Sequence, residues 1–400
     1  MNKRPELFFE NDLDDWKTIN IGEECNITIG EFVIKTLQND NSKYPVYNGG
    51  TTYTGFYNKW NETGKKVIIS ARGAAGFVNK CETNYWAGNS CYSLAPKSMD
   101  WKFLYYSLKN LQEDLIRSQQ SANIPAVSKA QVQAIDIYAP DIPTQQKISS
   151  LLNNIDLLIN NKEKELTKIS NFRHSMFNKM FPICDHKIPD LRFDNYNDNW
   201  NNISFVKIFD KLTNNSFSRD LLNYKKGKVK NIHYGDILIK FDYSIDINNE
   251  LVPFINEDVK VSNFKGKDYL RTCDVVFSDT AEDTTAGKMV EIINENGIPI
   301  LSGLHTYACR PNIEFYPGYL GLYLNTDQFH DQLLKYMQGT KVTSFNYEYL
   351  CRTVVSYPSY EEQKSIVNYF STLNELIHNI EIEIEKLKKL QTNLQVKLIA

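Results

Sequence analysis

The ends of the two halves of this chain repeat, whereas the segments between them do not. Residues 5–16 recur as residues 189–200, with Pro, Leu, Phe, Asp and Trp matched at a constant separation of 184 residues. A second block, Pro-x-x-x-x-Gln-x-x-Ile, begins at Pro140 and again at Pro358, a separation of 218 residues. A duplication of this kind constrains the chain to two copies of one structural unit. Because the separation grows, the middles of the two copies differ in length.

Each copy of the second block runs into a long helical pattern, with Pro143 and Pro358 expected just ahead of the helices. Apolar residues recur every seven positions, with a second series four residues later, which predicts a stripe that packs against another helix. Lys162 interrupts the first stripe. The predicted packing positions are Ile148, Leu152, Ile155, Ile159, Leu166 and Ile169 in the first helix and Ile366, Phe370, Leu373, Ile377, Ile380, Ile384, Leu387 and Leu394 in the second.

Two such helices of about 35 residues, each about 50 Å long, have each other as the obvious partners. If a pseudo-twofold axis relates the two halves, the helices pair as an antiparallel coiled coil. The pair then acts as a spacer between two globular heads. The predicted boundaries are residues 1–141 for head 1, 142–182 for the first helical spacer, 183–358 for head 2 and 359–400 for the second helical spacer.

Both heads are expected to be α/β. Short β-rich segments suggest strands at residues 66–70, 133–138, 236–240 and 274–278. Helices are expected at residues 101–115 and 316–336, at equivalent places ahead of the second repeated block. The predicted fold class is therefore α/β, with two α/β domains in tandem, each followed by a long helix.

Composition sets limits on function. The chain has 400 residues, of which 42% are hydrophobic, enough for two or three domain cores. No run of 18 apolar residues occurs, so we expect a cytoplasmic protein. The seven cysteines form no C-x-x-C pair, which favours reduced thiols over a metal site. The net charge of −3 does not by itself suggest nucleic acid, since DNA-binding domains are usually basic.

The order of several motifs, duplicated over nearly the whole chain, resembles the specificity (S) subunit of type I restriction-modification systems. These motifs lie at residues 44–50, 68–76, 122–128, 235–238 and 339–342, beside the Trp-containing and Gln-containing blocks. The resemblance implies that each head is a target-recognition domain that reads one half of a split, asymmetric DNA sequence. It also implies that the helices set the spacing and dock two methyltransferase (M) subunits, which restriction (R) subunits join.

Under this resemblance the chain is a non-catalytic subunit without cofactors, and S-adenosylmethionine, ATP and Mg²⁺ belong to its partner subunits. Basic side chains beside glycines and aromatic residues suit contacts to phosphates and base edges. For each of them an ordinary surface position or turn is the competing interpretation. The DNA-binding candidates are Tyr47, Asn48, Lys65, Lys66, Arg72 and Lys80 in head 1, and Lys225, Lys226, Lys228, Lys230 and Lys341 in head 2.

Catalytic motifs are absent from the sequence, and two other function classes remain open. There is no Pro-Pro dipeptide for an adenine methyltransferase loop, no phosphate-binding G-x-x-x-x-G-K-[ST] loop and no H-E-x-x-H motif. One alternative is a coiled-coil adaptor that binds proteins rather than DNA through its two heads. The other is an enzyme with an unrecognised site at residues 279–285, although the acidic spacing there fits no calcium loop and we expect no metal.

Overall fold

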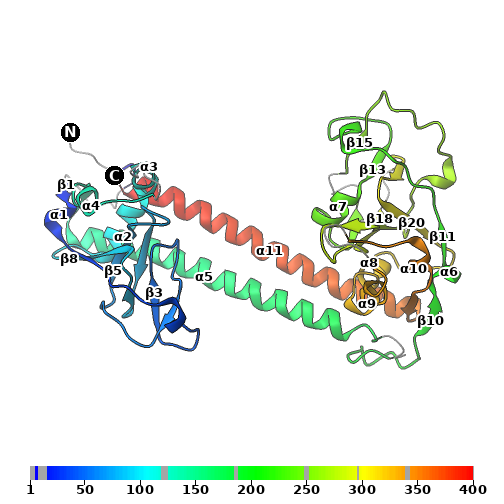
Figure 1. Cartoon of the computed structure of the whole chain (residues 1–400), viewed down its shortest axis with the longest axis horizontal. Coiled ribbons are helices and arrows are strands. Elements are labelled where there is room, and N and C mark those ends of the chain that lie inside the picture. Colours follow the sequence, from blue (N-terminus) through cyan, green and yellow to red (C-terminus); the bar gives the residue numbers. More distant parts are fainter. Residues whose placement is uncertain are drawn as a thin grey trace. The chain divides into compact units, whose positions relative to one another are not determined.

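The computed structural model describes residues 5–7, 16–118, 125–183, 188–246, 252–294, 297–337 and 343–399. The chain divides into two compact units, residues 1–165 with 380–400 and residues 166–379. Each unit consists of an α/β head and a portion of both long helices (Figure 1). The boundary between the two units therefore lies within the long helices. It does not test the predicted boundaries of the heads, which stay predictions.

Head 1 has a four-stranded antiparallel sheet and a smaller three-stranded sheet. The larger sheet runs in the order β2 (Cys25–Ile29), β8 (Cys91–Pro96), β5 (Lys66–Ser70) and β6 (Val78–Cys81). The smaller one runs β4 (Gly55–Tyr57), β3 (Tyr44–Tyr47) and β7 (Trp86–Ala87). Strand β5 is buried on both faces, which is why it reads as an unbroken apolar run. Helices α2 (Trp101–Asn110), α3 (Gln112–Arg117) and α4 (Lys129–Gln133) complete the head, with a short 3-10 turn at Lys35–Leu37.

Head 2 also contains two sheets. The larger runs β11 (Phe209–Lys211), β20 (Thr306–Pro311), β16 (Val275–Ser278), β18 (Met289–Asn294) and β14 (Ser244–Asp246). The other runs β12 (Leu222–Asn223), β15 (Phe254–Ile255), β13 (Lys230–Ile232) and β19 (Ile300–Ser302). A short pair joins β17 (Thr280–Ala281) to β21 (Thr343–Ser344). The helices are α7 (Tyr234–Ile239), α8 (Tyr319–Tyr323), α9 (Asp327–Leu334) and α10 (Tyr347–Cys351), with 3-10 turns at Arg219–Leu221 and Gly266–Asp268.

The strands that adjoin the repeated blocks form the same frame around both heads. In head 1, β1 (Lys17–Asn20) pairs antiparallel with β9 (Asp136–Ala139), and in head 2, β10 (Asn201–Ser204) pairs antiparallel with β22 (Val354–Tyr357). One helical turn follows each opening strand, α1 (Ile21–Glu24) and α6 (Phe205–Ile208). The tryptophan ahead of each frame is buried. The frame thus brings the two ends of each head together at the start of its long helix.

A buried glutamine explains the repeated Pro-x-x-x-x-Gln spacing. The amide of Gln145 donates to the Pro140 carbonyl at 2.9 Å, and its carbonyl accepts from the Asp100 N–H at 3.0 Å. In the second copy Gln363 donates to the Pro358 carbonyl at 3.0 Å and accepts from a backbone N–H of head 2 at 2.9 Å. Each glutamine thus satisfies backbone groups at the start of its helix and joins that helix to its head.

The long helices are α5 (Ile142–Lys179, 38 residues) and α11 (Tyr360–Leu398, 39 residues). In the first unit Gln391 donates to Asp156 at 2.5 Å, and Lys162 forms an ion pair with Glu383 at 2.9 Å. In the second unit the rings of Phe177 and Phe370 lie 5.5 Å apart. As the residue number rises along α5, the number of its contact residue in α11 falls. The two helices therefore run in opposite directions, as an antiparallel pair requires. The predicted packing positions are all buried or half-buried.

The predicted fold class is confirmed, with local differences. The helices expected at residues 101–115 and 316–336 are each broken into two, α2 and α3 in head 1 and α8 and α9 in head 2. Pro143 lies inside the first turn of α5, where a proline is tolerated because its missing N–H has no helical partner. The strand expected at residues 133–138 begins later, at Asp136, because α4 occupies the preceding residues. Residues 236–240 are not a strand but lie in α7 and its C-cap, since Asp236 pairs with Lys240 at the i,i+4 spacing of a helix.

Candidate functional site

Two glycine-containing loops of head 1 are fixed to each other. The Ala74 N–H donates to the Gly49 carbonyl at 2.8 Å, and the Ser70 hydroxyl donates to the Gly50 carbonyl at 2.8 Å. Gly49 and Gly73 both have positive φ angles, 79° and 78°. A Cβ at Gly49 would lie 2.4 Å from the Arg72 carbonyl oxygen. Glycine is required here by the close approach of the two loops, whatever these loops bind.

Arg72 lies exposed on this rigid loop pair. Its backbone N–H donates to the Ser90 carbonyl at 3.3 Å, and its backbone bridges to Ala126. Within the part of the chain that the structure describes, no ion pair or side-chain hydrogen bond of its guanidinium is found. A fixed backbone with an exposed guanidinium suits contact with a phosphate or a guanine edge.

The other head 1 candidates lie in different environments. Lys65 is exposed and has a φ of 62°. Lys66 forms an ion pair with Glu62. The half-buried Tyr47 packs edge-on against Tyr85 at 5.6 Å and donates to the Lys80 carbonyl at 3.4 Å, and burial raises the pKa of its hydroxyl. Asn48 accepts from the Ser90 N–H at 3.3 Å. Of these four residues, only Lys65 presents an uncommitted exposed charge.

Lys80 joins head 1 to the long helices. Its ammonium group forms an ion pair with Asp156 at 2.6 Å and donates to the Tyr106 hydroxyl at 3.0 Å. Tyr106 and Gln391 also donate to Asp156, at 2.6 Å and 2.5 Å. One carboxylate thus holds groups from β6, α2 and α11. The sequence predicted Lys80 as a DNA contact. In the structure its ammonium group is instead used in contacts within the folded chain.

The head 2 lysines also separate by environment. Lys225, Lys226 and Lys228 lie exposed between β12 and β13, and Lys226 contacts Glu257 at 3.5 Å. Lys230 is only 7% exposed and lies over the Phe254 ring at 5.4 Å, and burial lowers the pKa of its ammonium group. Lys230 therefore does not fit a role as a phosphate contact. Lys341 lies outside the described residues.

A second group of cations beside these lysines was missed by the sequence analysis. The buried carboxylate of Asp236 binds Arg219 through both oxygens, at 2.7 and 3.1 Å, and binds Lys240 at 2.9 Å. Arg219 and Lys240 both donate to the Tyr224 hydroxyl. The sequence signal for this group was the i,i+4 spacing of Asp236 and Lys240, which is typical of a helix. The signal was missed because the apolar residues between them also fit a strand.

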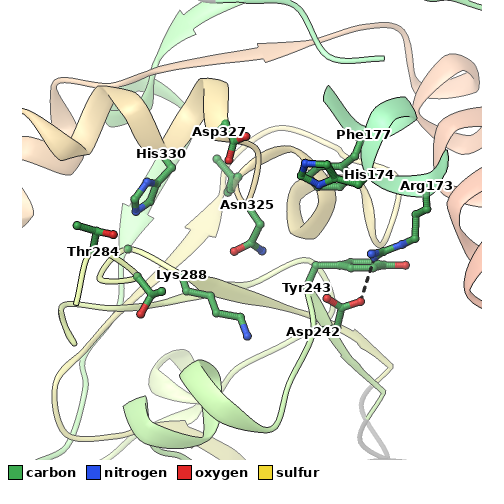
Figure 2. Close-up of a pocket in the computed structure, with 13 residues that line it drawn as sticks. Arg173, His174, Phe177, Asp242, Tyr243, Thr284, Lys288, Asn325, Asp327 and His330 are labelled. Atoms are coloured by element: carbon green, nitrogen blue, oxygen red, sulfur yellow. Dashed lines mark hydrogen bonds and ion pairs between the residues drawn. The ribbon is translucent and has the colours of Figure 1, made fainter. Parts of the chain in front are cut away.

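A cavity of about 480 Å³ lies within the second unit, between the end of α5, α9 and residues 284–288 (Figure 2). Several of its charged and ring groups have partners. Arg173 pairs with Asp242 at 3.2 Å, Lys288 donates to the Phe241 carbonyl at 2.7 Å, and a His330 ring nitrogen lies 2.9 Å from the Ala286 carbonyl. The arrangement contains charges of both signs and no paired nucleophile and base among its lining residues.

The acidic segment at residues 279–285 forms local hydrogen bonds. Asp279 lies 3.2 Å from a ring nitrogen of His305, and burial raises the pKa of its carboxyl group. Asp283 accepts from the N–H and hydroxyl of Thr285 at 2.8 and 2.5 Å. Across the described ranges, no group of three or more His, Cys, Asp or Glu side chains is arranged to hold a metal ion. The six described cysteines are free thiols, and no described helix is long and apolar enough to cross a membrane.

Comparisons with known proteins agree with the resemblance seen in the motifs. Residues 13–171 match the family model of the type I restriction modification DNA specificity domain. A putative type I specificity subunit of Mycoplasma pneumoniae is 23% identical over 203 residues, which cover 50% of this chain and 54% of that protein. The MjaVIII specificity subunit of Methanocaldococcus jannaschii is 24% identical over 313 residues, covering 74% of this chain and 70% of that protein. The match to the first relative thus spans only about half of its length.

Solved structures share the fold over nearly the whole chain. The crystal structure of a type I restriction-modification S subunit from M. genitalium covers 100% of this chain with a TM-score of 0.64 at 17% identity. A chain from a structural study of type I complex assembly and conformational transition covers 96% of it with a TM-score of 0.56 at 14% identity. The family match, the relatives and these folds together confirm the resemblance that the motif order indicated.

Proposed function

We propose that this chain, whose residues 13–171 match the type I DNA specificity domain and whose fold is that of solved specificity subunits, is the sequence-reading subunit of a type I restriction-modification complex. Each head reads one half of a bipartite, asymmetric duplex DNA target. The observation that carries the proposal is the duplicated frame, closed in both copies by a buried glutamine, around two heads that differ. Two different recognition heads on the same structural frame suit a DNA target whose two halves differ in sequence.

The exposed cations support DNA as the ligand. Head 1 presents Lys65 and Arg72, and head 2 presents Lys225 and Lys228. Lysine and arginine at such positions displace counterions from phosphates, a contribution that does not depend on the net charge of the whole chain. The net charge of −3 is therefore compatible with DNA binding when partner subunits contribute further phosphate contacts.

We further propose that catalysis resides in the partners. Two M subunits dock on the helical regions and carry adenine methylation with S-adenosylmethionine, and R subunits add ATP- and Mg²⁺-dependent chemistry. The chain itself supplies binding and spacing. A role on chromosomal DNA would place the complex in the cytoplasm. The exposed outer faces of α5 and α11, which include Leu157, Leu158 and Leu390, are available for docking.

A protein-binding adaptor is the second candidate, and an apolar segment of head 1 favours it. Phe32, Ile34 and Leu37 are 70%, 51% and 50% exposed within six residues of chain. Exposed apolar side chains that lie this close together are typical of protein contact surfaces. The two functions predict different outcomes when partner subunits are supplied.

Co-expression tests the proposal. The chain is produced with and without its M subunits in a host that lacks type I systems, and adenine methylation is mapped across the genome. We expect methylation at one bipartite motif only when both components are present, and no methyl transfer or cleavage by the purified chain with S-adenosylmethionine and Mg²⁺. Activity of the chain alone would overturn the proposal, and a stable complex without a sequence motif would favour the adaptor.

A further inference from the structure

We propose that the C-terminal corner of α7 is the part of head 2 that enters a groove of duplex DNA, with Ile239 as an apolar side chain in contact with the bases. The surface is defined by Arg219, Tyr224, Lys225, Ile239 and Lys240 and is called the α7 corner. This inference rests on the proposed function, because it assumes that head 2 reads DNA.

Ile239 is 85% exposed, more than any other large hydrophobic residue described. It is the last residue of α7, three residues after Asp236 and one before Lys240. Ile239 directly precedes Lys240, one of the two cations that Asp236 binds. Single exposed apolar residues are common on surfaces, but this one protrudes from a charged and aromatic setting.

The surrounding cations are held in place rather than mobile. Asp236, 1% exposed, accepts from both terminal nitrogens of Arg219 and from Lys240. Lys240 also lies over the Tyr224 ring at 4.4 Å, and Tyr224 accepts from Arg219 at 3.2 Å. The single buried carboxylate neutralises only part of the charge, because it serves two cations. A fixed cationic surface costs less ordering entropy when it binds.

Charge complementarity selects an anionic partner for this surface. Lys225 continues directly from Tyr224, and Lys226 and Lys228 extend the exposed cationic strip. Most acidic residues nearby already have partners: Asp236 binds its two cations, Glu257 contacts Lys226 and Asp242 pairs with Arg173. Asp220 is exposed beside Arg219, so cations still outnumber the carboxylates that are not ion-paired. Exposed cations close in sequence to one protruding apolar side chain suit a surface that binds phosphates and reaches into a DNA groove. There, apolar side chains contact thymine methyl groups or wedge between base steps.

Ile239 and the lysines then have separable roles. An apolar base contact contributes to sequence preference, whereas phosphate contacts strengthen binding to every sequence and increase its salt dependence. A protein-docking surface would show neither effect. This separation makes the α7 corner testable in the intact complex, without removing any buried group.

The experiment uses the full chain in complex with its M subunits, and Ile239→Ala is compared with Val206→Ala. Val206 is also exposed, at 56%, in the same unit but on α6. Genome-wide methylation maps give the motif for each variant. We expect Ile239→Ala to relax one base position in the head 2 half of the motif by roughly fivefold or more, the effect expected when one side chain no longer touches its base. The head 1 half and the Val206→Ala motif should remain unchanged.

A second variant, Lys225→Gln with Lys228→Gln, tests the phosphate contacts by titration of a duplex that carries the wild-type motif. We expect weaker binding and a salt slope reduced by one to two, roughly one for each lysine that no longer neutralises a phosphate, with no change of motif. An unchanged motif in Ile239→Ala together with an unchanged salt slope in the lysine variant would overturn the inference. If the wild-type complex shows no bipartite motif at all, the proposed function fails instead, so the two failures are distinguishable.

Discussion

Lys65 and Lys80 look equivalent in the sequence, and only their surroundings separate them. Lys65 is exposed, whereas the Lys80 ammonium group lies 2.6 Å from Asp156, a residue more than seventy positions away. An ion pair of this kind uses a charge that would otherwise be available to a phosphate. The partner cannot be identified from the sequence, because nothing in the local pattern around residue 80 points to the first long helix. Charge alone is therefore a weak guide to a DNA contact.

Glu291 is a second residue that the sequence did not single out. Its side chain is fully buried on β18 and accepts from the Gly318 and Gly321 N–H groups at 2.8 and 2.6 Å. Loss of hydration raises the pKa of its carboxyl group from 4.5 to about 7, although the N–H groups favour the ionised form. The residue ties the main sheet of head 2 to α8.

Glu291 should make the stability of the chain depend on pH. Because the folded pKa lies above the unfolded value, the stabilisation is complete below about pH 4.5 and is lost as the pH rises through about 7. When the pH is raised from 5 to 8, ionisation of this group should lower the free energy of unfolding by on the order of 2 kcal/mol. Glu291→Gln, which cannot ionise, should lack that component. Urea unfolding of both proteins at the two pH values measures it.

The exposed Glu314→Gln substitution is the matched control for this measurement. Its difference from the wild type should stay constant with pH. If the difference between Glu291→Gln and the wild type were equally constant, ionisation of Glu291 would not contribute to stability in this range.

Among the elements, the long helices were predicted well and the short ones were not. The heptad positions of α5 and α11 repeat over 38 and 39 residues, so many apolar residues agree on one period. Residues 234–239 offer only two turns, and an apolar segment of that length fits a strand equally well. Here the ion pairs of Asp236 decided in favour of a helix.

Lengthening the helix pair tests its role as a spacer. One heptad is inserted into both helices, after Glu165 in α5 and after Asn379 in α11, where the two units divide. The contacts within each unit are then kept, and the helices gain about 10 Å, the axial length of about three base pairs. We expect both half-site sequences to be retained and the unspecific spacer between them to lengthen. Methylation mapping reads out the spacing.

Insertion of the heptad into α5 alone is the control, because it shifts one helix against the other. We expect this variant to lose thermal stability, since each long helix contributes apolar residues to the head cores. A double insertion that is stable but leaves the spacer length unchanged would refute the function of the helices as a ruler.

At the scale of the whole molecule, the frame and the heads carry separate information. The frame is duplicated in sequence and in structure, whereas the sheets of the two heads differ in strand number and order. Each head also has its own hydrophobic core. Recognition by one head should therefore be independent of the identity of the other.

Exchange of residues 20–140 for those of a related specificity subunit tests this independence. The exchange keeps Trp16, most of β1 and the complete first long helix, and it replaces α1, β9 and Pro140 with their counterparts. We expect only one half of the methylated motif to change. An unchanged motif, or a change in both halves, would contradict the assignment of one half-site to each head.

The sequence by itself determined the duplication, the two long amphipathic helices and the α/β character of the heads. These features rest on periodic patterns that extend over many residues, so local deviations do not erase them. The duplicated Pro-x-x-x-x-Gln spacing was visible in the sequence, but its reason, a buried amide that joins helix and head, was not.

Only the tertiary structure decided which cations remain available. Among the predicted cations, Lys66 and Lys80 are ion-paired and Lys230 is buried. Arg219 and Lys240, which the sequence did not single out, share the buried carboxylate of Asp236. The physical reason is that the availability of a charge depends on its burial and on partners distant in the chain. Helix periodicity repeats within each turn and can be read locally, whereas an ion pair between distant residues exists only once the chain has folded.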